Sequence, residues 1–171
     1  VAFNGSAVGV QGLSMEEGFP IGFDFTYHDR IMNRFAIGSA GFVVLGKDRV
    51  SIDPSSSSFL FSRENEGTGY LFGVLSTATT MGCATTEISY KLIGNAPART
   101  LVIQYKNLGQ ETAFYGDNPV DSVNLQIRLS EGTNAISFVL DRWVNHNSVK
   151  NIRIGLKGAS VEDLHMRMTV N

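Results

Sequence analysis

Cysteine and proline are scarce in this sequence, and long apolar runs are absent. The 171 residues include one Cys and four Pro. A single Cys excludes an intrachain disulfide and a cysteine-rich zinc site. No apolar run approaches the ~18 residues of a membrane-spanning helix, and no block of Lys and Arg of the kind that contacts nucleic acid is present. We therefore expect neither membrane insertion nor nucleic-acid binding.

Charge of either sign is low as well. The 14 Lys and Arg residues against 16 Asp and Glu give a net charge of −2, whereas 43% of the residues are hydrophobic and 10% are aromatic. That apolar content supports a folded core rather than disorder. The length predicts one domain, so we expect residues 1–171 to form a single domain. Because the sequence starts at Val1 and ends within an expected strand, we expect it to be excised from a larger multidomain protein.

Apolar and polar residues alternate along much of the chain, whereas helical periodicity does not recur. The clearest case is 122–130, where the apolar side chains share one face and polar ones share the other. Gly-containing loops at 94–98 and 131–134 predict two hairpins. Strands are expected at 7–13, 21–27, 35–37, 42–45, 58–62, 70–75, 88–93, 99–107, 122–130, 136–138, 151–157 and 164–170.

One-sided alternation of this kind indicates antiparallel sheets with one solvated face. The sequence therefore predicts an all-β fold, a two-sheet antiparallel β-sandwich of jelly-roll type, with a closed barrel as the alternative. Strand pairing beyond the two hairpins does not follow from a single sequence.

No motif assembles an active site. Residues 41–47 have the spacing of a phosphate-binding loop, but Asp48 follows where Ser or Thr is needed, and 42–45 is an apolar strand pattern. Cys83 is expected to be a small, half-buried residue rather than a nucleophile. A sandwich glycosidase needs two carboxylates that flank the sugar bond, whereas these acids are scattered and expected to be solvated: Glu87, Glu111, Glu131 and Asp141. We expect no enzyme, and a sandwich-fold hydrolase is the less favoured alternative.

The sequence argues against a transition-metal site but leaves a calcium site possible. No two His residues have ligand spacing for a transition metal. Asp117, Asn118 and Asp121 lie close together in a Gly-containing loop, and calcium binds loop carboxylates and carbonyls. A structural calcium ion is therefore the one cofactor that the sequence leaves open, with ordinary polar turn residues as the alternative.

The polar faces of two strands offer a binding hypothesis. Gln104 and Lys106 lie on one, and Asn124, Gln126 and Arg128 on the other. If these strands pair, they form a row of amides and cations with planar hydrogen-bond geometry. Sugar-binding sandwiches combine such rows with a flat aromatic side chain, for which Tyr70, Tyr115 and Trp143 are candidates. An ordinary solvated sheet face is the alternative, and a lone Trp usually packs in the core.

Several segments resemble a group of bacterial secreted domains. Residues 99–107 (RTLVIQYKN) resemble one of their strands, with Tyr105 where Trp is common, and 124–138 (NLQIRLSEGTNAISF) resemble the strand–turn–strand that follows. Residues 21–27 (IGFDFTY) and 35–42 (FAIGSAGF) resemble the first part of these domains, and 154–158 (IGLKG) resemble their last part. These domains are nidogen-like or lectin-like sandwiches in large secreted or surface proteins of Bacteroidetes type. The resemblance implies a β-sandwich at the bacterial cell surface or outside the cell, and it transfers no catalytic residue.

The expected function is a non-catalytic extracellular recognition or adhesion module with a glycan or a cell-surface protein as its partner. A structural spacer or assembly module is the alternative, and self-association through an uncovered edge strand is a further one.

Overall fold

The computed structural model describes residues 6–8, 18–38, 41–50, 71–76, 87–109, 122–144, 151–158 and 163–170. Within these ranges the chain forms eleven strands. No helix in them is long and apolar enough to cross a membrane. The strands are β1 (Ser6–Val8), β2 (Phe19–Tyr27), β3 (Arg30–Gly38), β4 (Phe42–Gly46), β5 (Leu71–Ser76), β6 (Glu87–Ile93), β7 (Thr100–Gly109), β8 (Ser122–Ser130), β9 (Ile136–Val144), β10 (Asn151–Lys157) and β11 (Leu164–Val170).

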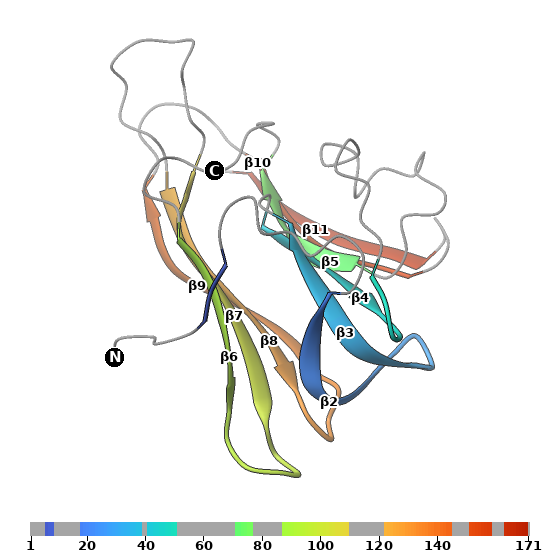
Figure 1. Ribbon diagram of the computed structural model, residues 1–171. Coiled ribbons are helices and arrows are strands. Elements are labelled where there is room, and N and C mark those ends of the chain that lie inside the picture. The colour runs from blue at the N-terminus through green and yellow to red at the C-terminus, as the bar shows by residue number, and fades with distance from the viewer. Residues whose placement is uncertain are drawn as a thin grey trace.

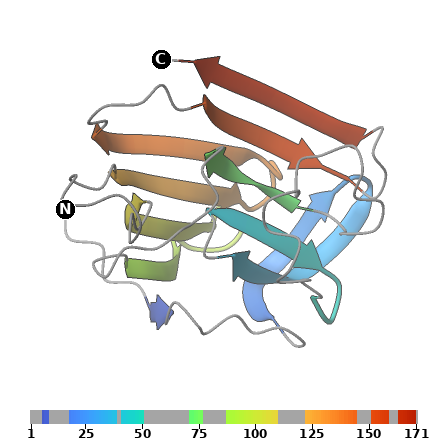
Figure 2. The ribbon, with the colours of Figure 1, turned by 90° about the horizontal axis from the view of Figure 1, so that it is seen from above.

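The strands form two antiparallel sheets, as the alternation predicted (Figure 1). One sheet has five strands in the order β1-β6-β7-β8-β9, and the other has six in the order β11-β10-β5-β4-β3-β2. Four consecutive strands run as a meander in each sheet, and β1 and β11 lie at opposite sides of the molecule (Figure 2). Both predicted hairpins are confirmed, because β6 pairs with β7 and β8 pairs with β9.

The β2–β3 connection is tighter than the sequence suggested. Tyr27 pairs with Arg30, so His28 and Asp29 alone form the turn, with φ angles of 48° and 58°. Two positive φ angles define a type I′ turn, whose twist matches that of the flanking strands. The strand expected at 35–37 consequently begins at Arg30. The predicted strand at 58–62 lies outside the described residues.

The core lies between the sheets and is built from the alternate, inward-facing side chains. On β2, every second residue from Ile21 to Tyr27 is buried, and the residues between them are exposed. The most deeply buried core side chains come from both sheets: Phe25, Phe35, Ile37, Val43, Ile103, Tyr105, Ile127 and Leu129.

The outward-facing residues of β3 and β4 are buried too. Ala36, Phe42 and Val44 are each exposed by 3% or less, although they alternate with the core residues. This explains the unbroken apolar run at 42–45, since a strand buried on both faces does not alternate. Lys157 on β10 is also only 1% exposed, and burial lowers the pKa of its ammonium group.

The hydroxyl of Tyr105 joins the two sheets. Tyr105 projects from β7, and its Oη lies 3.0 Å from the carbonyl oxygen of Gly38 and 2.8 Å from that of Phe42. A phenol has one proton, so the two carbonyls share it. Burial raises the pKa of the Tyr105 hydroxyl well above its usual range, which keeps it a donor.

Three further contacts tie β2 to the other sheet. The amide of Thr26 donates to Oδ1 of Asn134 at 2.8 Å. The guanidinium of Arg99 lies 5.7 Å from the ring centroid of Phe23. Gly22 adopts a φ of +93° and lies against the side chain of Leu92.

The same Arg99 holds the β8–β9 turn. It donates from Nε to Oε2 of Glu131 at 2.8 Å and from Nη2 to the other carboxylate oxygen. The backbone amide of Arg99 also donates to Oε2 of Glu131 at 3.0 Å, and the amide of Glu131 donates to the carbonyl oxygen of Arg99 at 2.8 Å. Glu131 is therefore not the solvated acid that we expected, since its side chain is only 14% exposed. The ion pair lowers the pKa of the Glu131 carboxyl to about 2.

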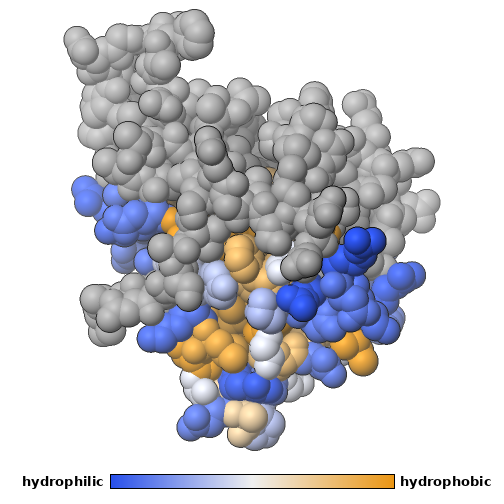
Figure 3. Space-filling model, in the orientation of Figure 1, coloured by the Kyte–Doolittle hydropathy of each residue, from blue (hydrophilic) through white to orange (hydrophobic). Residues whose placement is uncertain are grey.

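A few large apolar side chains remain at the surface. Apolar surface bordered by hydrophilic residues is visible low on the molecule (Figure 3). In the described part of the chain, the most exposed are Ile31, Leu92, Ile93 and Leu140, at 52%, 38%, 44% and 43%.

Candidate functional site

The predicted polar residues lie on the side of the five-stranded sheet that faces away from the core. Their chain neighbours, among them Ile103, Leu125 and Ile127, are buried between the sheets. Because side chains alternate along a strand, the residues between them face outward. We call this surface the outer face of β6–β9. It comprises Glu87, Ser89, Lys91, Val102, Gln104, Lys106, Asn124, Gln126, Arg128, Ser137, Val139 and Arg142.

The structure brings the expected residues together because β7 and β8 pair. Gln104 lies directly opposite Gln126, and Val102 lies opposite Arg128. The row continues to Ser89 on β6 and to Val139 on β9. Residues far apart in the sequence therefore share one surface.

Hydrogen bonds connect three of these side chains in a row, and in each bond the donor is the residue nearer the Arg128 end. Arg128 donates from Nε and Nη2 to Oε1 of Gln126, at 3.0 and 2.6 Å. Gln126 in turn donates from Nε2 to Oε1 of Gln104 at 2.8 Å. A guanidinium can only donate, so the carbonyl of Gln126 must face Arg128. This fixes the amide orientation of Gln126 and, through it, that of Gln104.

Two predicted residues serve the sheet itself. Lys106 pairs with Glu87 at 3.1 Å on the neighbouring strand, and both side chains are well exposed. Oδ1 of Asn124 accepts a hydrogen bond from the amide of Asn107 at 2.9 Å. Asn107 has a φ of 52° and lies where the β7–β8 register shifts, so Asn124 supports this irregularity.

The outer face of β6–β9 is cationic although the whole chain is not. It carries Lys91, Lys106, Arg128 and Arg142 against Glu87 and the adjoining Asp141, which lies at the β8–β9 register shift. In the described part of the chain, only the Lys106–Glu87 pair among these groups forms a salt bridge. The face thus has a net charge of +2 on a chain of −2.

Val102 is a buried apolar residue within this polar surface. It is 3% exposed although it faces outward. Its lateral neighbours are Lys91 on one side and Arg128 on the other. Long charged side chains cover apolar surface with their aliphatic stems while the charged ends stay in water. Lys91 and Arg128 are the residues placed to cover Val102 in this way.

The remaining predicted site residues are not part of this geometry. Tyr70, Tyr115 and the expected calcium ligands Asp117, Asn118 and Asp121 lie outside the described residues. Of Trp143 only the backbone is described, in β9 opposite Val123. No group of three metal-ligating side chains is found within the described ranges.

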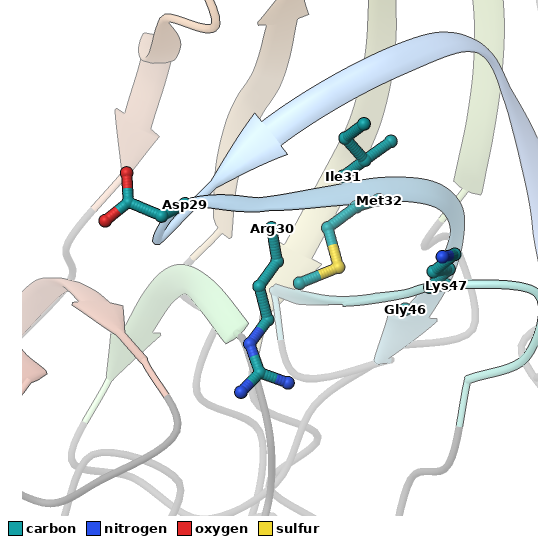
Figure 4. Close-up of a pocket in the computed structure, with 6 residues that line it drawn as sticks. All are labelled: Asp29, Arg30, Ile31, Met32, Gly46 and Lys47. Atoms are coloured by element: carbon teal, nitrogen blue, oxygen red, sulfur yellow. The ribbon is translucent and has the colours of Figure 1, made fainter.

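A pocket of about 570 Å³ lies on the other sheet, beside the β2–β3 turn (Figure 4). It was not expected from the sequence. Its lining residues are Asp29, Arg30, Ile31, Met32, Gly46 and Lys47. The volume suits a small ligand, but the Asp29 side chain points away from the others (Figure 4). The lining therefore does not converge on a reacting group.

The family model described as NIDO related matches residues 6–170, nearly the whole chain. The chain belongs to the NIDO-related family. Comparisons with curated proteins and with solved structures found no match. Nidogen-related domains are typically extracellular, which suggests the same setting for this NIDO-related chain.

The match of the NIDO-related family includes every strand of the outer face of β6–β9. It also includes Arg99 and Glu131, which the sequence analysis did not connect. Little in the sequence indicates this ion pair, because 32 residues separate Arg99 from Glu131 and each lies next to a turn. Only the hairpin register shows that the two turns lie side by side.

Proposed function

We propose that this NIDO-related chain is a non-catalytic extracellular recognition or adhesion module that binds a glycan on the outer face of β6–β9. One observation supports it: the directed hydrogen-bond row of Arg128, Gln126 and Gln104. Side-chain amides and guanidinium groups are planar and bind vicinal oxygens through paired hydrogen bonds. The resemblance to bacterial surface domains supports a secreted or cell-surface protein as its parent.

A glycan array on the purified chain, run with and without calcium, tests the proposal. We expect specific hits that Arg128→Ala weakens by ~10-fold or more, because hydrogen bonds to a charged group contribute ~1.5–3 kcal/mol. Lys47→Ala, a cation beside the pocket on the other sheet, is the matched control and should bind as the parent does. Hits that require calcium would assign a metal to the Asp117, Asn118 and Asp121 loop.

Two outcomes would contradict the proposal. Hits lost with Lys47→Ala and kept with Arg128→Ala would move the site to the pocket. An empty array in both conditions would favour the alternative, a structural spacer or assembly module whose outer face is only a solvated sheet.

A further inference from the structure

The hydrogen-bond row on the outer face of β6–β9 leaves donors unused and acceptors occupied. The carbonyl oxygens of Gln126 and Gln104 both accept within the row, and Oδ1 of Asn124 accepts from the backbone. Within the described part of the chain, Nε2 of Gln104 has no partner. A ligand that lies on this row therefore meets mainly N–H groups and must supply the acceptors.

Arg128 likewise has N–H donors that no described residue accepts. Its Nε and Nη2 are directed at Oε1 of Gln126. This occupies one edge of the planar group and leaves the Nη1–Nη2 edge without a partner among the described residues. Two parallel N–H groups at the edge of a guanidinium match the two oxygens of a carboxylate.

The charge of the surrounding face also favours an anionic ligand. Lys91 lies two strands from Arg128, on the far side of Val102, and Arg142 lies on β9 opposite Asn124; neither forms a salt bridge within the described residues. An excess of like charges on one face attracts an anion. Glu87 pairs with Lys106, so Asp141 beside Arg142 is the acid of this face that remains to offset the cations, and the excess stays positive.

We infer that the ligand of the outer face of β6–β9 is an acidic glycan, and that Arg128 binds its carboxylate through the Nη1–Nη2 edge while Gln126 orients the guanidinium. This inference rests on the proposed function and specifies its ligand class. A glycan is favoured over an acidic peptide because Ser89, Gln104 and Ser137 add neutral hydroxyl and amide groups in the adjoining positions, which suit sugar hydroxyls.

Matched sugars isolate the contribution of the carboxylate. Oligosaccharides of galacturonate, glucuronate and mannuronate would each be titrated into the chain as the free acid and as the methyl ester, by isothermal titration calorimetry. At least one free acid should bind ~10-fold or more tightly than its own ester. Adding salt to about 0.5 M should reduce that preference, because exposed charges are screened.

Variants locate the effect. Arg128→Gln should abolish the preference for the acid, whereas Arg128→Lys keeps the charge without the planar edge and should retain only part of it. Gln126→Met retains the Arg128 side chain but removes the oxygen that accepts its hydrogen bonds. Because Gln126 is a positioning residue, this variant should reduce the acid-to-ester ratio more than it reduces binding of the ester. Lys47→Gln on the other sheet should leave the ratio unchanged.

The outcomes separate this inference from the proposed function. An acid and its ester that bind equally, or array hits confined to neutral glycans, would overturn the acidic ligand and leave glycan recognition intact. Failure of every glycan would overturn both. Poly-glutamate bound as tightly as the best uronate would overturn the assignment to a sugar. A preference that survives Arg128→Gln would overturn the role of Arg128.

Discussion

The buried hydroxyl of Tyr105 is the residue-scale feature that most directly stabilises the contact between the sheets. Tyr105→Phe removes only the oxygen and leaves the carbonyls of Gly38 and Phe42 without this donor. A buried polar group left unsatisfied costs ~1–3 kcal/mol. We expect the free energy of unfolding, measured with urea, to fall by that amount.

Tyr90→Phe is the matched control for Tyr105→Phe. The Tyr90 ring packs against Phe19 and Phe35, and its hydroxyl has no partner within the described residues. Its removal should change stability by less than about 0.5 kcal/mol. Equal losses for both variants would show that the hydroxyl of Tyr105 contributes nothing beyond its volume.

Acid should weaken the protein through Glu131. Arg99 lowers the pKa of this carboxyl from 4.5 to about 2. A folded-state pKa below the unfolded value adds stability that is complete above the unfolded pKa and disappears as the pH falls through the folded one. The stability difference between the parent and Glu131→Gln should therefore be constant above about pH 5.5 and shrink as the pH falls toward 2. Urea titrations across this range measure it, and a constant difference would contradict it.

Single residues show where sequence analysis works and where it ends. The polarity of Gln104, Gln126 and Arg128 and their places on strands follow from the alternation. The two carbonyl partners of Tyr105 lie 63 and 67 positions away, and no local pattern encodes such a pairing. Glu131 was misjudged for the same reason, because its partner lies on another turn.

At the scale of elements, the β3–β4 connection depends on the absence of a side chain. A Cβ at Gly38 would collide with the ring of Phe42. Gly38→Ala should lower stability by ~1–3 kcal/mol, the usual cost of overpacking. Combining it with Phe42→Leu should cost less than the sum of the two single changes, because the smaller side chain makes room. Thermal unfolding of the four proteins gives this coupling, and strict additivity would contradict the collision.

Asn134 caps the edge strand β2 from the opposite sheet. Its side chain accepts the amide proton of Thr26, and its own φ is 52°. Asn134→Gly keeps a residue that tolerates this φ and removes only the cap. The amide of Thr26 should then exchange its proton ~2- to 13-fold faster, the factor for a bond of ~0.5–1.5 kcal/mol. Met32, which pairs with Phe25 on the neighbouring strand, provides the internal control, since its exchange should not change.

Elements with a clear apolar pattern, alternating or continuous, were predictable, and those without one were not. Residues 122–130 alternate cleanly and form β8 as expected. By contrast, the first half of β3 carries Arg30, Asn33 and Arg34 without alternation and was missed. The turn at His28 and Asp29 lacks Gly, which usually identifies a type I′ hairpin.

At the scale of the whole molecule, the sandwich was predictable and its strand order was not. Alternation shows that strands have two kinds of face, but it does not show which strands are neighbours. The placement of β1 beside β6 and of β10 beside β5 depends on contacts between distant segments. The outer face of β6–β9 was an exception, because the four strands that form it are consecutive in the chain.

The position of Tyr105 also has a kinetic consequence. Because 63 and 67 positions separate the partners, we expect its hydroxyl to reach its two carbonyls late in folding, once the sheets have docked. Interactions absent from the transition state affect the unfolding rate and leave the folding rate nearly unchanged. Tyr105→Phe should thus accelerate unfolding by ~5- to 150-fold in stopped-flow measurements, the factor for ~1–3 kcal/mol. Slower folding with an unchanged unfolding rate would instead place this contact among the first to form, and docking of the sheets would precede the completion of either one.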